Sequence, residues 1–264
     1  MRPFYLSLKL VFICIWLSAF FAPDSFSAGS SGRDRLSLSE GVCVEKSEAF
    51  FSKGRTKEAV NCLKSFIRSH ERPDHKERVH HYLYFLLGNY YSTLSRSENS
   101  GDEKSSSTMA AQCYRKALEA DPGFYAAWLN LAGCCYEMED YKEAALAFEN
   151  AYEYSDPKKA VHYYYAAVCR FQSQQGKKAL VLFDTLFREH PDQITLAWKE
   201  TLVNILFSLE RYREALPHIE ELARASQQPK KKRWQEVLLN RYLILEMDEK
   251  ALAYAGFLTG SDPL

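Results

Sequence analysis

The sequence predicts an all-α protein built from about six antiparallel helix pairs. A small residue recurs along the chain at separations of 51, 34, 35, 36 and 36 residues, at Ala59, Ala110, Ala144, Ala179, Ala215 and Ala251. Apolar residues near these markers lie three, four and seven positions apart, which places them on one face of a helix. Repetition at this period is typical of stacked helical arrays.

The composition supports a folded protein without a strong preference for charged partners. Of the 264 residues, 47% are hydrophobic, which is enough to bury a core. The 34 basic residues balance the 34 acidic ones, so the whole chain has no net field that would attract nucleic acid. We therefore expect no nucleic-acid partner.

The first 27 residues have the pattern of a signal peptide. Arg2 and Lys9 precede an apolar run, Leu10 to Ala22, that is too short to cross a bilayer comfortably on its own. Ser25 and Ser27 are the small residues expected before a cut, so we predict an exported protein, periplasmic or secreted, with residues 28–38 as a linker. The alternative is an uncleaved N-terminal anchor in the membrane.

Two apolar stripes flank a polar turn in the clearest copy, at Trp128, Leu131 and Ala132 and then at Ala144, Phe148 and Ala151. Ala132 and Ala144 are small because packed helix axes approach to roughly 8–10 Å. One such pair cannot cover its own apolar face, so the next pair is expected to stack on it.

These marks resemble those of the tetratricopeptide repeat family, whose unit of about 34 residues is a helix, a turn and a second helix. The resemblance covers residues 39–264 and is most specific in the middle three copies. It implies a right-handed superhelical solenoid with a concave surface. Residues 92–108 are almost all polar or small, so we expect a flexible insertion there.

Catalytic chemistry is not indicated. The sequence has no triad, phosphate loop or paired carboxylates in an identifiable cleft, so we predict a protein that is not an enzyme and needs no cofactor. His75, His80 and His81 are irregularly spaced, which favours a solvated link over a metal site. The cysteines that remain after cleavage are interpreted as small core residues with free thiols, at Cys43, Cys62, Cys113, Cys134, Cys135 and Cys169.

The resemblance implies that ligand-facing positions lie on the first helix of each pair. Aromatic rings supply contact area there, and asparagine amides can bind an extended peptide backbone. The alternative is that several of the rings pack between repeats. The positions are Phe85, Asn89, Leu129, Asn130, Tyr136, Tyr164, Tyr165, Phe171, Asn204, Phe207 and Asn240.

The kind of peptide follows from a comparison within this resemblance. Members that bind a C-terminal carboxylate use two asparagines with flanking cations, and Asn89 and Asn130 match the asparagines. Phe85, Val161 and Tyr165 stand where the cations belong, so an apolar or aromatic peptide is expected. Replacing Tyr136 and Tyr164 with alanine should then remove binding and leave stability nearly unchanged.

The C-terminal repeat offers two further surfaces. The last helix presents Leu252, Ala255, Phe257 and Leu258, and six residues follow it, so we expect a homodimer or a docked partner there; the alternative is a frayed end. The run "KKKR" at 230–233 is expected to be a solvated face, and the alternatives are contact with anionic lipid or an acidic partner.

The function that these features favour is a non-catalytic scaffold. It would bind a peptide or partner segment in its concave groove during assembly of an envelope complex. The alternative is a membrane-anchored adaptor or pilotin-like assembly factor. Cys14 lacks the small preceding residues of a lipid-attachment site, which counts against the alternative.

Overall fold

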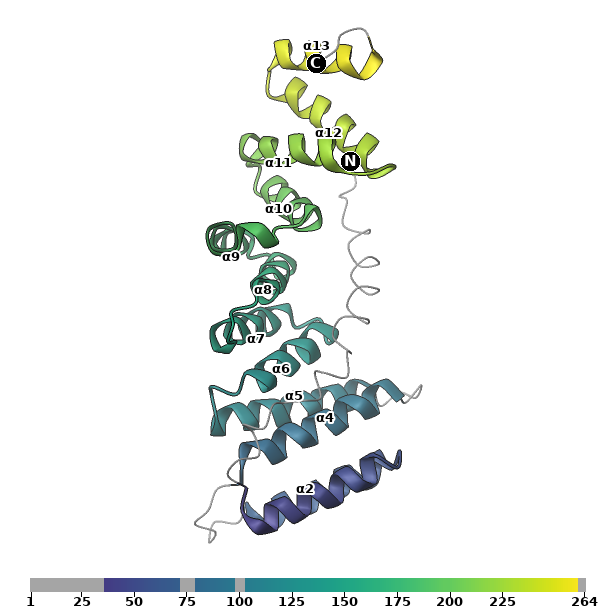
Figure 1. Cartoon of the computed structure of the whole chain (residues 1–264), viewed down its shortest axis with the longest axis vertical. Helices are drawn as coiled ribbons and strands as arrows, with labels where there is room; N and C mark the ends of the chain where they lie inside the picture. Colours follow the sequence, from purple (N-terminus) through teal and green to yellow (C-terminus); the bar gives the residue numbers. More distant parts are fainter. Residues whose placement is uncertain (1–35, 72–78, 98–102, 261–264) are drawn as a thin grey trace. The chain divides into compact units, whose positions relative to one another are not determined.

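The computed structural model describes residues 36–71, 79–97 and 103–260, and these parts of the chain are helical with no strand (Figure 1). The predicted all-α fold class is confirmed. A short 3-10 helix, η3 (Pro191–Gln193), precedes α10. The twelve α-helices of the described residues are α2 (Leu38–Phe51), α3 (Thr56–His70), α4 (His81–Ser97), α5 (Glu103–Ala120), α6 (Tyr125–Glu137), α7 (Tyr141–Tyr154), α8 (Ala160–Gln172), α9 (Gly176–Glu189), α10 (Leu196–Ser208), α11 (Tyr212–Ala225), α12 (Lys230–Ile244) and α13 (Asp248–Thr259).

Two compact units divide these helices. The first unit extends to Met138 and contains α2 to α6, and the second begins at Glu139 and contains α7 to α13. The boundary falls in the turn between α6 and α7, inside the clearest sequence copy. The predicted signal peptide, residues 1–27, lies outside the described residues, as does most of the predicted linker.

The recurring alanines lie in the cores of the units. Five of the six are 0% exposed and Ala251 is 3% exposed, as expected for positions where helices approach closely. Four residues after each marker, five copies bury a large side chain: Leu63, Tyr114, Phe148, Phe183 and Ile219. The sixth copy has the small, half-buried Ala255 at this position.

The first unit begins with a well-defined helix start. The Ser37 hydroxyl accepts a hydrogen bond from the Glu40 backbone N–H, and the Glu40 carboxylate accepts one from the Ser37 N–H at 2.9 Å, which is a capping box. The other oxygen of Glu40 accepts a bond from the His80 N–H at 2.9 Å. One carboxylate thus closes the N-terminus of α2 and fixes the chain entering α4.

The helices α4 and α5 are longer than the repeat period requires. Residues 92–97 continue α4 and residues 103–108 belong to α5, so the prediction of a flexible insertion over 92–108 is wrong at both ends; residues 98–102 lie outside the described part. The Ser95 and Ser107 hydroxyls form a buried hydrogen bond of 2.7 Å between the helices. Small polar side chains therefore join two helices here, although their composition suggested a loop.

Short turns of one kind recur in the second unit. Four residues with positive φ stand just before the second helix of a pair, at Glu139 (62°), Gln174 (62°), Glu210 (57°) and Glu246 (56°). The corresponding turn of the first unit has a glycine, Gly54, at 72°. The left-handed conformation is unfavourable for residues with a Cβ atom, so Gln174, Glu210 and Glu246 are held there by the packing of the helices that they join.

Candidate partner-binding surface

All eleven predicted partner-binding residues lie on the first helix of a pair, but they differ in burial. Four are buried: Phe85 and Asn89 on α4 and Tyr164 and Tyr165 on α8. Six are partly exposed, namely Leu129, Asn130, Tyr136, Phe171, Asn204 and Phe207, and Asn240 on α12 is exposed. The prediction that all of them face a ligand is therefore wrong for the four buried residues.

In the first unit, the two asparagines bond each other. The Asn89 side-chain oxygen accepts hydrogen bonds from the Tyr114 hydroxyl at 2.9 Å and from the Asn130 amide at 2.8 Å. Phe85 packs edge-on against Phe124, with ring centroids 4.8 Å apart. Burial raises the pKa of Tyr114 well above its usual value, so its hydroxyl stays a hydrogen-bond donor. This network connects α4, α5 and α6.

In the second unit, the two predicted tyrosines of α8 pack against neighbouring helices. Tyr164 stacks on Trp198 with centroids 4.6 Å apart and an interplanar angle of 7°. Its hydroxyl lies 3.1 Å from the Thr201 hydroxyl, and burial raises its pKa to about 12. Tyr165 packs on Phe148 at 5.4 Å. Replacing Tyr164 with alanine would therefore remove core contacts, and the expectation of unchanged stability is wrong for this residue.

One accessible residue of the predicted set, Phe207, contacts an arginine of α12. The guanidinium carbon of Arg241 lies 4.6 Å from the ring centroid of Phe207 and 4.8 Å from that of Tyr212. The two rings meet edge-on at 5.7 Å. We call Phe207, Tyr212 and Arg241 the Arg241 cluster. Asn204 lies one turn before Phe207, and Asn240 precedes Arg241 in sequence.

The Arg241 cluster has the chemistry of an anion-binding surface. Within the described residues Arg241 makes no ion pair, and its buried Nε has no hydrogen-bond partner. A planar guanidinium stacked on aromatic rings can still donate two parallel hydrogen bonds to a carboxylate. Arg241 and Tyr212 were not predicted from the sequence, because neither occupies a ligand-facing position of the resemblance. No sequence pattern marks them, apart from the spacing of about one repeat between Phe207 and Arg241.

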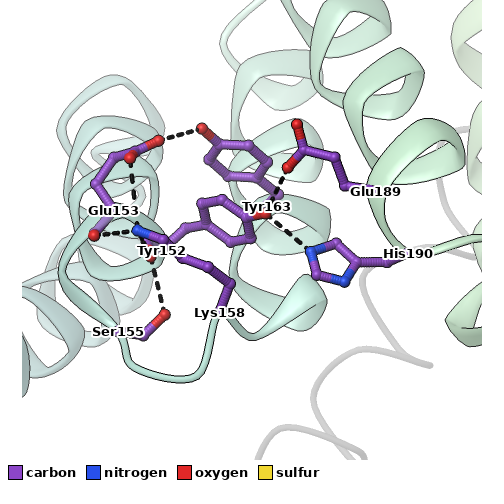
Figure 2. Close-up of polar contacts among 7 residues, drawn as sticks. All are labelled: Tyr152, Glu153, Ser155, Lys158, Tyr163, Glu189 and His190. Atoms are coloured by element: carbon purple, nitrogen blue, oxygen red, sulfur yellow. Dashed lines mark hydrogen bonds and ion pairs between the residues drawn. The ribbon is translucent and has the colours of Figure 1, made fainter.

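A second polar cluster joins α7, α8 and the end of α9 (Figure 2). The rings of Tyr152 and Tyr163 stack with centroids 3.7 Å apart. The Tyr152 hydroxyl donates to Glu189 at 2.9 Å and lies 2.8 Å from Nε2 of His190, while Tyr163 donates to Glu153 at 2.6 Å. Burial and the acceptor carboxylates raise the pKa of both phenols, that of Tyr152 to about 12. Both are therefore protonated donors at neutral pH.

Lys158 belongs to the same cluster and contacts the C-terminal end of α7. Its ammonium group donates to the backbone carbonyl of Tyr152 at 3.1 Å and to that of Glu153, and it lies 3.6 Å from the Glu153 carboxylate. The Ser155 hydroxyl also donates to the Tyr152 carbonyl, at 2.8 Å. The last carbonyls of a helix have no partner within it, so these side chains satisfy the end of α7. The cluster in Figure 2 is thus a structural joint.

Comparison with known proteins bears on the repeat. A model of the tetratricopeptide repeat matches residues 107–160. This part of the chain is therefore similar to the tetratricopeptide repeat.

Solved structures share the fold of this chain at low sequence identity. A double mutant of MamA from RS-1 is 16% identical over 77% of this chain and 98% of that chain, with a TM-score of 0.50. A tetratricopeptide repeat protein from Parabacteroides merdae is 17% identical over 84% and 80%, also with 0.50. A structure of Naa15/Naa10 bound to HypK-THB gives 0.58 at 16% identity, over 83% of this chain and 31% of that one. No curated sequence matches.

Tetratricopeptide arrays use extended surfaces to bind other proteins. In this one, no three potential metal ligands gather within the described residues, and His75 lies outside them. The rings of His80 and His81 are tilted by 33° with centroids 4.2 Å apart, and Nε2 of His81 lies 3.7 Å from the Asp121 carboxylate. No helix in the described ranges has both the length and the apolar character to cross a bilayer.

The cysteines of the described residues are mostly buried, and the basic run lies mostly on the surface. All six cysteines from Cys43 onward have free thiols, and all but Cys62 are buried. In the run 230–233, Lys230 pairs with Glu200 at 3.1 Å and Lys232 is exposed, whereas Lys231 is half-buried. The C-terminal helix exposes Leu252, Phe257 and Leu258, as expected.

Proposed function

We propose that this protein is a non-catalytic scaffold that binds an extended segment of a protein partner on the first helices of its second unit. The observation that carries the proposal is the Arg241 cluster. Its guanidinium carbon lies within 5 Å of the ring centroids of both Phe207 and Tyr212, and Arg241 has no carboxylate partner in the described part of the chain. Asn204 and Asn240 add amide groups suited to a peptide backbone. The partner segment would present a carboxylate to Arg241 and apolar contacts to the rings.

The place of action that we propose is the cell envelope, where the scaffold would take part in assembly of a complex. This part of the proposal is supported by the N-terminal pattern, in which Arg2 and Lys9 accompany the apolar run from Leu10 to Ala22. Mass spectrometry of the protein purified from its own cells measures the mature N-terminus. Cleavage before Ala28 supports export, and a retained Met1 in the cytosolic fraction overturns it.

Site-specific photocross-linking in cells tests the binding surface. With p-benzoylphenylalanine placed at Asn240, we expect one or a few discrete adducts to form with envelope proteins. The matched position is Val181, which is 63% exposed on α9, a second helix of its pair. Equal adduct patterns from the two positions, or none from Asn240, would contradict the proposed surface.

The role of the guanidinium is tested by a conservative change. Arg241→Lys keeps the positive charge but cannot form two parallel bonds to a carboxylate, so binding of the cross-linked partner should weaken by at least about tenfold. Arg213→Lys, at an exposed position of α11, is the control and should have no effect. Unchanged binding by the Arg241 variant would show that Arg241 does not contact the partner.

A further inference from the structure

A cavity of about 500 Å³ lies among α11, α12 and α13 in the second unit, which are the green to yellow helices of Figure 1. This volume is in the range of sites that bind small ligands. Its apolar wall comes from all three helices, through Ala223, Leu238, Ala253, Tyr254 and Phe257. Phe257 is 41% exposed, so the wall continues onto the surface.

Charged side chains around the cavity are mainly basic. Arg224 on α11, Lys231 on α12 and Lys250 on α13 line it, and none forms an ion pair with a residue that the structure describes. Glu220 is the acidic residue among the lining side chains, and its carboxylate accepts a hydrogen bond from Tyr242 at 2.7 Å. Three cations and one anion leave a formal excess of two positive charges.

We propose that this cavity binds an acidic peptide segment with one large apolar side chain between its carboxylates. The apolar side chain would enter the cavity, where it contacts Leu238 and Tyr254 and leaves water. The flanking carboxylates would pair with the cations at its edge.

The distribution of the cations favours a peptide over an amphiphile with one head group. Arg224, Lys231 and Lys250 come from three different helices, so they suit several separated carboxylates better than a single one. None of them belongs to the Arg241 cluster. The site therefore goes beyond the proposed function, because it needs neither Phe207 nor Asn240.

Fluorescence anisotropy with defined probes tests the ligand chemistry. The probe is a fluorescein-labelled peptide, Asp-Glu-Leu-Phe-Glu-Asp. Two controls change one property each: the amide form Asn-Gln-Leu-Phe-Gln-Asn lacks the charge, and Asp-Glu-Ser-Ser-Glu-Asp lacks the apolar side chains. We expect each control to bind at least about tenfold more weakly than the probe.

Matched variants of the full chain test the location. Ala253→Trp fills the cavity and should abolish binding, whereas Leu252→Trp, at a neighbouring position that is 75% exposed and does not line the cavity, should not. Lys231→Gln with Lys250→Gln should weaken binding at least about tenfold, and the exposed Lys232→Gln should change it by less than about twofold. The lysine variants decide the question if Ala253→Trp fails to fold.

Three results would overturn the inference: equal affinity for the acidic and the amide peptides, unchanged binding by the lysine double variant, or displacement of the probe by dodecanoate at concentrations where the peptide itself does not compete. Phe207→Ala separates the two proposals. It should leave probe binding intact and reduce cross-linking at Asn240, so unchanged cross-linking with normal probe binding would contradict only the proposed function.

Discussion

The two units of the molecule bury different kinds of polar side chain. In the first, the buried hydrogen bonds join neutral groups, as in Asn89 with Tyr114 and Ser95 with Ser107. In the second, a histidine is buried: His162 is 4% exposed, and burial, together with the nearby Lys159, lowers its pKa to about 4. The same repeat thus accepts interiors that respond differently to pH.

The second unit has ion pairs between helices that are partly shielded from water. In the second unit, Arg170 on α8 makes two bonds of 2.7 Å to the Glu149 carboxylate on α7, and Lys199 on α10 contacts Glu221 on α11 at 2.5 Å. These pairs are partly shielded from water, which makes them less sensitive to salt than surface pairs. We infer that the repeat specifies small residues at helix crossings but leaves the polar contacts between helices free to vary.

The largest expected effect is in the first unit. Tyr114→Ala removes a ring that is 1% exposed and should lower the free energy of unfolding of this unit by about 3–5 kcal/mol. Hydrogen exchange measured by mass spectrometry separates the response of the two units. The control is Tyr254→Ala on α13, whose side chain is half-buried and whose loss should cost much less. Similar losses for the two variants would remove the distinction.

Acid should act on the second unit through His162. The pKa of its imidazole in the folded state is about 4, below the usual value of 6.5, so the unfolded chain binds more protons between these pH values. The contribution of His162 to the free energy of unfolding is fully present above pH 6.5. It falls as the pH is lowered toward 4, by about 3 kcal/mol at most. Burial lowers the pKa of His218 as well, which adds a loss in the same direction.

Urea unfolding at a series of pH values, followed by hydrogen exchange in each unit, measures this dependence. His162→Leu should flatten the pH dependence of the second unit. In the first unit, burial also lowers the pKa of His81, and Asp121 opposes that shift, so a smaller slope is expected there. An unchanged slope in the His162 variant would assign the acid sensitivity to other groups.

Glycine substitutions sharpen the comparison within the first unit. A Cβ atom on Gly88 would lie 2.6 Å from a ring carbon of the buried Tyr114, so Gly88→Ala should cost about 1–3 kcal/mol. Gly41 in α2 has no atom within 4 Å of the same position. Gly41→Ala should therefore stabilise by about 0.5–1 kcal/mol through helix propensity. Opposite signs in thermal unfolding are the expected result, and equal signs would contradict the close contact.

The smallest effect concerns the turns of the second unit. Gln174 has a φ of 62°, which glycine adopts without strain, so Gln174→Gly should stabilise the second unit by about 0.5–1 kcal/mol. Gln174→Ala keeps the Cβ atom and should give no gain. Differential scanning calorimetry of both variants measures the difference, and a gain with alanine would assign the effect to the side chain.

The fold was predictable because packing at helix crossings leaves a regular trace in the sequence. A small residue stands at each of these helix crossings, and the last five markers keep a spacing of 34–36 residues even in weak copies such as that around Ala251. The extent of α4 and α5 was not predictable, because serines that form a buried bond between helices have the composition of a loop. Only the position of the facing helix distinguishes the two.

The candidate site was predictable only in part. The resemblance placed the right residues on first helices, but whether a ring faces a ligand depends on the side chain that the next repeat sets beside it. Trp198 and Thr201 of α10 cover Tyr164, and the residues next to Tyr164 in the sequence do not predict these contacts. Arg241 was missed for the converse reason, because its surroundings on Phe207 and Tyr212 come from a different repeat.

The left-handed turns of the second unit have a consequence for how such a chain can change length. They follow one another at intervals of 35, 36 and 36 residues, at Glu139, Gln174, Glu210 and Glu246, with φ values between 56° and 62°. A gene segment duplicated or removed between two such codons would rejoin backbones of matching geometry, and the helices on either side would keep their phase. Unequal recombination at these points adds or deletes whole repeats without a new loop.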